Sequence, residues 1–600
     1  MVVLLLFPLA LADSFTLAAG DSLAELVKDA QATSGPDTIS VASDYVSDGV
    51  GVDVSGEALA FEPLDGVSYE LPPLYGTSAT LDITGATFTG GVKYPGAYFG
   101  ADAYCALCLA LSELVLRDVE IATTANHGVL VLDTDVSADG LTLYGTPGRG
   151  FSHYSYTAET TVTLSGSTFY GNTAGAIKVY NGGGDLNFTL HDSLVYGNTS
   201  VEGAGIYVYG EDIEVIDTTF ESNRTRAGGT IHLNSAGGTF TGATISRNWA
   251  AWGDLVFADL GGHDLVFSEC SLTGGTSGFD AIVNGEGNLL VENSLWAPSG
   301  IFERIDGAMQ VTGTLIGAPS TRLGAIYGYA TTLSVTDNVV CGVGNALVDF
   351  DGVVVGAEGS NVEFARNVVT GIAGESALLF SGGIDNAAAG PAYFEIVDNT
   401  FVANDSASLF EGEATGLLFV NNLVKDSVAY FDLESFPSAT TGDYNLWHGV
   451  SPSAGPGFPA DWGAHDVTGQ DPLLVDSFDP YSCGSEPGLK DGSPAIDAGD
   501  PGRTDADGES RSDIGAIDGT RGAGPGGSVD LDGDGYPADV DCDDDNPRVN
   551  PAGDDEPYDD IDQDCDGVAA TISYGGGCAC DGAFAGSPAL FLLALARRRR

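Results

Sequence analysis

Short runs in which apolar β-forming residues alternate with polar residues follow one another along most of the chain, and Gly or Asn separates them. One phrase of this kind returns between Leu143 and Gly275 at nearly constant spacing. Its closing residues are Thr146, Asn172, Asn198, Asn223, Asn248 and Thr273, which are 26, 26, 25, 25 and 25 positions apart. The chain is therefore a repeat protein.

A second phrase runs in phase with the first. It occupies Gly175–Tyr180, Gly205–Tyr209, Gly229–Leu233 and Gly253–Phe257. Alternation at this period predicts coils of two or three short strands around a narrow core, with Gly or Asn in the turns and the Asn side chains stacked from coil to coil. A leucine-rich repeat would need a helix in every period, and no helical pattern accompanies these phrases. The predicted fold class is all-β, a parallel β-helix.

These phrases resemble the right-handed parallel β-helix, or pectin-lyase-like, superfamily, and especially its Gly-Gly-Ala-Ile-Tyr and Gly-Asn-x-Ala variants on bacterial surfaces. The resemblance covers about residues 38–450. It implies a right-handed parallel β-helix (solenoid), but this fold hosts lyases, hydrolases, adhesins and phage tailspikes alike. The resemblance therefore does not select a function.

The start of the chain predicts export and a capped solenoid. Residues 1–12 are interpreted as a signal peptide, with an apolar run and the small residues Ala10 and Ala12 before the cleavage site. Leu23 to Ala30 is predicted to be an amphipathic helix that covers the N-terminal end of the core. The solenoid is expected to span residues 13–470.

The phrase persists more loosely in the second half. Asn338, Asn367, Asn399 and Asn422 repeat it at spacings of 29, 32 and 23 positions. The excess residues should form inserted loops on one side of the stack, and such loops usually make the binding surface of a solenoid.

The charge balance restricts the partners. The chain has 85 acidic residues against 21 basic ones, a net charge of -64. Such a surface repels nucleic acid and anionic lipid and attracts divalent cations. We therefore expect no nucleic-acid partner.

Residues 471–518 differ from the repeats and are expected to close the solenoid. The phrase from Asp491 to Asp500 and the residues around Arg511 resemble the C-terminal portion of the choice-of-anchor Q proteins, which are surface β-helices. Asp497, Asp500 and Asp513 near Arg511 suggest a structural ion-pair and turn network. Residues 519–529, rich in Gly, form a predicted linker.

Residues 530–568 are predicted to form an acidic metal-binding module. Oxygen ligands at Asp530, Asp532 and Asp534, the carbonyl of Tyr536 and the carboxylate of Asp541 follow the spacing of a calcium loop, although flanking helices are not evident. A second ion is expected among Asp543, Asp545, Asp562, Asp564 and Asp566. Hard oxygen ligands favour Ca²⁺ as the cofactor.

The same module resembles the metal-binding motif family of secreted bacterial proteins, one branch of which is linked to copper. The family phrase has a further Cys where this chain has Tyr558, and the module contains neither His nor Met. A disordered acidic tail is the alternative, but Cys542 and Cys565 are placed to join the module by a disulfide.

Residues 569–600 are expected to form a sorting or anchor tail. An apolar run followed by Arg597 to Arg600 resembles the myxobacterial C-terminal sorting tail, which implies modification at Cys578 or Cys580 and engagement of the membrane or the sorting machinery. A plain membrane anchor is the alternative. Both interpretations predict a secreted, cell-surface or outer-membrane-anchored protein.

Catalytic phrases are weak in this sequence. The β-helix hydrolases share a Gly-His-Gly phrase, whose nearest echo is Asn126-His127-Gly128, and the arginine and histidine phrases of pectate lyases do not occur. A glycosidase would need two carboxylates on either side of a sugar, which so many acids leave open. A polysaccharide lyase or glycoside hydrolase therefore remains the alternative to a non-enzymatic adhesin.

Aromatic and basic residues favour the binding rod. Tyr144, Tyr170 and Tyr196 recur at steps of 26 residues and are predicted to stack as a ladder. The candidate ligand-binding residues are Arg224, Arg226, Arg247, Trp249 and Trp252, from adjacent coils. The expected partner is an extracellular polysaccharide or cell-envelope matrix, and the expected state is a monomer. Cys105 and Cys108 predict either a local disulfide or two buried thiols, and the states of Cys270, Cys341 and Cys483 stay open.

Overall fold

The computed structural model describes most of the chain between residues 13 and 516. The residues outside the description are 1–12, 31, 33–34, 43, 65, 94–103, 123–125, 251–254, 274–280, 298–300, 306, 318–325, 330–331, 342–352, 355–360, 381–391, 413, 428, 434–436, 438, 455–458, 460–461, 476, 479, 481–486, 505–510 and 517–600.

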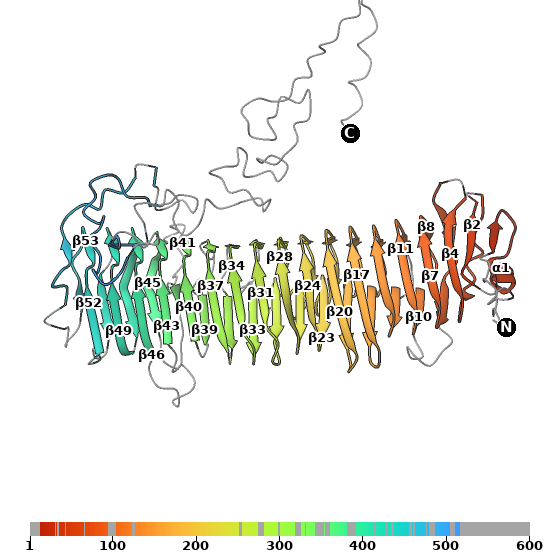
Figure 1. The fold of residues 1–600 in the computed structure, drawn as a ribbon, viewed down its shortest axis with the longest axis horizontal. Helices are drawn as coiled ribbons and strands as arrows, with labels where there is room; N and C mark the ends of the chain where they lie inside the picture. Colours follow the sequence, from red (N-terminus) through yellow and green to blue (C-terminus); the bar gives the residue numbers. More distant parts are fainter. Residues whose placement is uncertain are drawn as a thin grey trace, which may run out of the picture. The chain divides into compact units, whose positions relative to one another are not determined.

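The strands stack side by side along one axis, and each coil adds one strand to each of three parallel sheets, called A, B and C (Figure 1). A representative coil runs through β16 in sheet B, β17 in sheet A and β18 in sheet C. The next coil places β19, β20 and β21 on these three strands in parallel register. Every second residue of β17 and β20 is buried, as alternation along a strand requires.

Sheet A has 18 strands in the described part of the chain. In stacking order they are β1 (Ser14–Leu17), β2 (Asp37–Val41), β4 (Ala58–Pro63), β7 (Thr80–Thr84), β11 (Glu113–Arg117), β14 (Asp135–Asp139), β17 (Glu159–Ser165), β20 (Asp185–His191), β24 (Asp212–Ile216), β28 (Gly237–Thr241), β31 (Leu265–Ser268), β34 (Leu289–Glu292), β37 (Ala308–Thr312), β40 (Thr332–Thr336), β43 (Asn361–Ala365), β46 (Ala392–Val397), β49 (Ala414–Val420) and β52 (Ala439–Asp443).

Sheet B contains β3 (Val52–Asp53), β6 (Leu74–Thr77), β10 (Tyr104–Ala110), β13 (His127–Leu132), β16 (Arg149–Ser155), β19 (Ile177–Asn181), β23 (Ile206–Tyr209), β27 (Ile231–Asn234), β30 (Val256–Asp259), β33 (Ala281–Gly285), β36 (Ile301–Ile305) and β39 (Ile326–Tyr329), with β9 (Val92–Lys93) antiparallel to β10. On later coils the corresponding strands are β42 (Val353–Val354), β45 (Ala373–Phe380), β48 (Asp405–Gly412), β51 (Tyr430–Leu433) and β54 (Ser453–Ala454).

Sheet C contains β5 (Tyr69–Leu71), β8 (Ala86–Phe88), β12 (Glu120–Ala122), β15 (Thr142–Tyr144), β18 (Thr168–Tyr170), β21 (Leu194–Tyr196), β25 (Thr219–Glu221), β29 (Thr244–Ser246), β32 (Ser271–Thr273), β35 (Leu295–Ala297), β38 (Leu315–Ile316), β41 (Val339–Cys341), β44 (Val368–Thr370), β47 (Thr400–Val402), β50 (Leu423–Lys425), β53 (Leu446–His448) and β55 (Val467–Thr468). A separate pair, β22 (Thr199–Ser200) and β26 (Arg224–Thr225), widens one corner.

Both ends of the apolar core are covered. Helix α1 (Leu23–Ala30) lies at the N-terminal end and buries Leu23, Val27 and Ala30 against the core. At the other end, the Trp462 ring lies 6.0 Å from the Phe419 ring centre and 5.2 Å from that of Phe431. Strand β1 precedes Asp37–Val41, so the sequence analysis missed the first strand.

The predicted amide ladder is confirmed in the first half of the solenoid, at the corner that follows the sheet C strands β18, β21, β25 and β29. Asn198 Oδ1 accepts hydrogen bonds from Asn172 N at 3.0 Å and Asn172 Nδ2 at 2.9 Å. Asn223 and Asn248 repeat this pattern on the next two coils. The residue before each ladder position has a positive φ, for example 65° at Gly171, which is a conformation that Gly adopts without strain.

The Asn phrases of the second half occupy a different corner. Asn338, Asn367, Asn399, Asn422 and Asn445 precede their sheet C strands and bond to one another by the same two hydrogen bonds per coil. The two sets of phrases are therefore alike in chemistry but not in position along the coil, which the sequence analysis did not separate.

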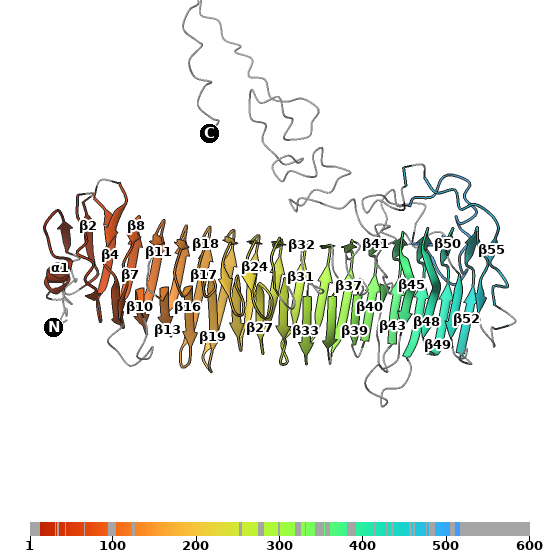
Figure 2. The same ribbon diagram turned by 180° about the vertical axis from the view of Figure 1, so that it is seen from behind.

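The segment from residue 471 to 516 runs back along the outside of sheet C (blue in Figure 2). Ala495 and Ile514 pack on Leu423 and Leu446, and Gly515 N donates to Asn421 O at 2.7 Å. Of the expected network, the turn hydrogen bonds are present, since Asp513 Oδ1 accepts from Asp497 N at 2.7 Å, but Arg511 donates to the carbonyl oxygens of Gly499 and Ala498 and, within the described part of the chain, forms no ion pair with Asp497 or Asp500. The segment thereby covers apolar residues of sheet C over several coils.

Candidate functional site

The residues predicted to bind a ligand are partly brought together. The Arg224 guanidinium carbon lies 4.5 Å from the centre of the Trp249 ring, and Trp249 is 37% exposed. Arg247 forms a 2.6 Å ion pair with Glu221 instead, and Arg226 is exposed on the same corner. Trp252 lies outside the described residues.

The tyrosine ladder is confirmed on the outer face of sheet C. The rings of Tyr144 and Tyr170 are 4.7 Å apart and those of Tyr170 and Tyr196 are 5.0 Å apart, with interplanar angles of 4° and 9°. Tyr144 donates to Glu120 Oε1 at 2.7 Å, and this hydrogen bond raises the pKa of Tyr144 to about 12. The rings cover one another, which suits a shielding role better than a free stacking platform.

The outer face of sheet B carries a cluster that the sequence analysis did not find. Parallel register places Ser152, Lys178, Tyr207, His232 and Phe257 in one outward column on successive strands. Tyr154, Tyr180 and Tyr209 form the neighbouring outward column. We call Arg149, Tyr154, Lys178, Tyr180 and Tyr207 the sheet B cluster.

Lys178 is the centre of the sheet B cluster. Its ammonium nitrogen lies 3.1 Å from Tyr154 Oη and 4.9, 5.6 and 5.8 Å from the ring centres of Tyr154, Tyr180 and Tyr207. Among the described residues, no carboxylate forms an ion pair with Lys178. In a chain with 85 acidic residues, this lysine is therefore held by aromatic faces rather than by an acid.

Arg149 is the second basic residue of the sheet B cluster and lies against Tyr207. Its guanidinium donates to the carbonyl oxygens of Ile177 at 3.2 Å and Glu202 at 3.1 Å, and it lies 5.3 Å from the Tyr207 ring centre. Burial lowers the pKa of Arg149 to about 10, so it remains a cation at neutral pH. The sheet B cluster thus holds two basic side chains, Arg149 and Lys178, against the ring of Tyr207.

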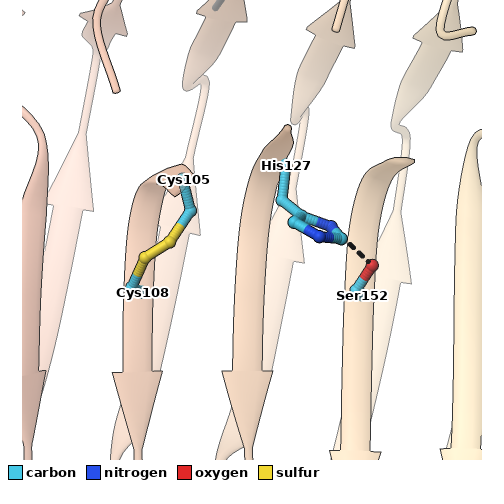
Figure 3. The surroundings of a disulfide bond; sticks show 4 residues. All are labelled: Cys105, Cys108, His127 and Ser152. Carbon is cyan, nitrogen blue, oxygen red and sulfur yellow. Dashed lines mark hydrogen bonds between the residues drawn. A yellow bond between two sulfur atoms is a disulfide. The ribbon is translucent and has the colours of Figure 1, made fainter. Parts of the chain in front are cut away.

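His127, the nearest echo of a hydrolase phrase, points toward Ser152 (Figure 3), and the register pairs it with Arg149 of the sheet B cluster. Its Nδ1 is 3.2 Å from Ser152 Oγ, and burial, followed by the charges of Arg149 and Lys178, lowers the pKa of His127 to about 4. Ser152 is completely buried, so its hydroxyl cannot reach a polymer on the surface. His127 and Ser152 therefore do not form an accessible nucleophile and base.

Cysteine placement answers part of an open question. Cys105 and Cys108 form a disulfide within β10, next to His127 in the register of sheet B (Figure 3). Cys270 is a buried free thiol, and Cys341 is disulfide-bonded. Cys483 lies outside the described residues.

Exposed carboxylates lie on sheet A, which is a different sheet of the solenoid from the one that carries the sheet B cluster. One groove there, of about 360 Å³, is lined by Asp212, Glu214 and Asp264. Asp212 Oδ1 bonds to His263 Nδ1 at 2.8 Å, and Asp264 Oδ1 accepts from Asn288 Nδ2 at 2.8 Å. Asp212 and Asp264 are thus engaged with neighbours.

The described residues contain neither a metal-ligand cluster nor a membrane-spanning helix. No group of three or more His, Cys, Asp or Glu there is arranged to hold a metal ion. No helix in that same part of the chain combines the length and apolar character needed to cross a membrane. The expected calcium ligands and the cysteines of the module and the tail, all between residues 530 and 580, lie outside the description, so those predictions stay predictions.

The comparison with protein families agrees with this architecture. A family model described as a right-handed beta helix region matches residues 105–248 and 153–312. No curated protein matches the chain. The fold is therefore that of a right-handed parallel β-helix, and the comparisons do not separate an adhesin from an enzyme.

The second repeated phrase of the sequence, Gly175–Tyr180 and its copies, contains the pattern that could have predicted the sheet B cluster. Once Ile177 is placed in the core, alternation turns Lys178 outward, and the same step in later phrases gives Tyr207, His232 and Phe257. Aligning the repeated phrases by residue identity does not reveal this column, because each of its positions holds a different residue type.

Proposed function

We propose that the chain is a non-enzymatic, exported surface rod whose sheet B cluster binds an acidic polysaccharide of the extracellular or cell-envelope matrix. The observation that carries the proposal is Lys178, a cation held by tyrosine faces with no carboxylate partner among the described residues. A sulfate or carboxylate group of a polysaccharide would supply that partner, and the tyrosine rings would contact the sugar.

The proposal also accounts for what surrounds Lys178. A pKa of about 4 makes His127 a weak base and Ser152 is buried, so the cluster offers recognition groups without a general base matched to neutral pH. Strongly negative surfaces elsewhere would repel an acidic polymer and guide it to this face. A lyase or hydrolase remains the alternative, since the carboxylates of sheet A are accessible.

A combined binding and turnover experiment tests this proposal. The purified chain is titrated with oligogalacturonate, alginate and heparin fragments at 0.15 M salt, while unsaturated products and new reducing ends are followed. We expect binding of at least one polymer without turnover, and about tenfold weaker binding for Lys178→Gln, since a charge-assisted hydrogen bond from Lys178 to the polymer would contribute about 1.5–3 kcal/mol.

The matched control is Lys28→Gln, which removes the same charge from the exposed face of α1. It should leave binding unchanged. Robust cleavage of any polymer, or equal affinity for Lys178→Gln and Lys28→Gln, would contradict the proposal.

A further inference from the structure

A second groove, on the outer face of sheet A, differs from the sheet B cluster in charge and shape. It spans β37, β40, β43 and β46 and has a volume of about 440 Å³. One column there holds the small residues Ala308 and Thr332, and the register continues this column through Asn361 on β43 to Tyr393 on β46. Ala308, Thr332 and Tyr393 all line the groove.

Tyr393 forms one end of this groove as a flat aromatic surface. Its side chain is 39% exposed. The next strand places Gly416 beside it, where a Cβ atom would lie 2.5 Å from the Tyr393 ring. The ring therefore rests on bare backbone, and any larger residue at this position would displace it.

The other column of the groove carries hydrogen-bonding groups, in the order Gln310, Ser334, Glu363 and Glu395. Ser334 Oγ donates to Glu363 Oε2 at 3.0 Å, and Arg503 donates to Glu395 Oε1 at 3.2 Å. Among the described residues, the second oxygen of each carboxylate accepts no hydrogen bond. Both carboxylates line the groove together with Tyr393.

We propose that this groove binds a hexose unit of a neutral polysaccharide. The apolar face of the sugar stacks on Tyr393, and its hydroxyl groups donate to Glu363 and Glu395. Because the two carboxylates stand on adjacent strands, an acidic sugar would be repelled, whereas a neutral one would not. The site is independent of the sheet B cluster, so the rod would have two faces of opposite selectivity.

The test uses the full chain and three neutral probes, cellohexaose, mannohexaose and maltohexaose, in saturation-transfer NMR and calorimetry. At least one should bind at millimolar concentration, and Tyr393→Ala should weaken it at least tenfold while Tyr393→Phe retains it. Tyr104→Ala, which removes a tyrosine that is 41% exposed elsewhere, should have no effect. A far-ultraviolet spectrum confirms that each variant is folded.

Three results would overturn the inference. They are the absence of binding by all three neutral probes, unchanged affinity in Tyr393→Ala, and tighter binding of a chitosan or oligogalacturonate hexamer that Tyr393→Ala abolishes. Lys178→Gln should not alter the neutral-sugar affinity, and Tyr393→Ala should not alter binding of the acidic polymer. The failure of either proposal is thus visible separately.

Discussion

The strands of sheet C from Thr142 to Thr273 and those from Leu295 to His448 continue one ladder but have different outward faces. In the first region the outward positions hold Thr142, Thr168, Leu194, Thr219, Thr244 and Ser271, of which Leu194 alone is apolar and all are at least partly exposed. In the second, after the partly buried Leu295, they hold Leu315, Val339, Val368, Thr400, Leu423 and Leu446, which are between 0 and 9% exposed. The segment from residue 471 to 516 covers this second region.

This difference shows that one repeat can form either a two-sided or a one-sided sheet. Strands such as Thr-Leu-Tyr and Thr-Phe-Glu alternate, as expected when one face meets solvent, whereas Val-Val-Cys and Leu-Val-Lys are nearly continuous apolar runs, as expected when both faces are buried. The covering segment is therefore part of the folding unit of the second region.

The largest expected effect comes from removing that segment. A chain ending at Gln470 exposes the apolar outward residues of sheet C and should lose on the order of 5 kcal/mol in its C-terminal coils, since each buried Leu or Val contributes about 1.5–3 kcal/mol. Solenoids lose stability locally, so the coils before Thr273 should stay intact. Limited proteolysis with mass spectrometry locates the first cuts.

The control for this truncation is a chain ending at Ala516, which retains the covering segment and should resist protease as the full chain does. Cuts spread evenly over both regions, or equal resistance in the two truncated chains, would contradict the assignment.

Lowering the pH should destabilise the first region relative to the second, by a smaller free energy than the truncation does. His153 lies in the core between Val131 and Val179, and burial lowers the pKa of His153 to about 4. Between this value and the unfolded value of about 6.5, only the unfolded state binds the proton, so stability falls by roughly 3 kcal/mol as the pH decreases through that range. In the second region, burial raises the pKa of Asp398, so its protonation favours the folded state as the pH falls.

The His153→Val variant should fit the core, because its neighbours in the same column are already Val, and should remove only its own share of the loss, since burial also lowers the pKa values of His127 and His232. Thermal melts and regional hydrogen exchange at pH 7, 6 and 4.5 make the measurement. A pH profile identical to that of the parent chain would mean that another group controls the acid response.

The fold was predictable because a solenoid repeats its physical constraints at every coil. A buried side-chain amide must recur at the same place to find its partner, so the spacing of Asn172 and Asn198 predicted both the coil and the ladder. The shift of the ladder to another corner at Asn338 was not predicted, because the spacing of a phrase does not reveal which strand it follows. The covering segment was not foreseen either, since it depends on contacts between residues about 100 positions apart, such as Thr400 and Ala516.

The sheet B cluster was only half visible in the sequence. Lys178 and Tyr207 belong to a repeated phrase, but Arg149 and Tyr154 come from a strand that does not repeat its wording. Their meeting depends on the register of parallel strands and on the alternation that turns each side chain outward. The Arg224 and Trp249 contact was easier to anticipate, because both residues lie near ladder positions.

The smallest expected effect comes from replacing one Asn in each of the two amide ladders. Asn198→Ala removes the acceptor for Asn172 N and Asn172 Nδ2, and Asn399→Ala does the same to Asn367. Each change leaves buried donors unpaired and should cost about 2 kcal/mol in local unfolding free energy. Asn187→Ala, on the exposed face of sheet A, is the control and should cost less than about 0.5 kcal/mol.

Replacing Asn198 and Asn399 with Ser tests whether the two corners differ in how well they accept a hydroxyl in place of an amide. The corner that holds Asn399 is occupied on earlier coils by Ser193, whose Oγ accepts from Ser167 N at 3.1 Å, so this corner already accommodates a hydroxyl in place of the amide. Asn399 and Asn198 each stand between two amide neighbours, so a difference between their serine variants reports the corner, and we expect Asn399→Ser to be the milder change. Hydrogen exchange at the N–H groups of Asn172 and Asn367 reports each site separately. Equal exchange rates in the two serine variants would mean that the ladder alone, and not the corner that holds it, determines local stability.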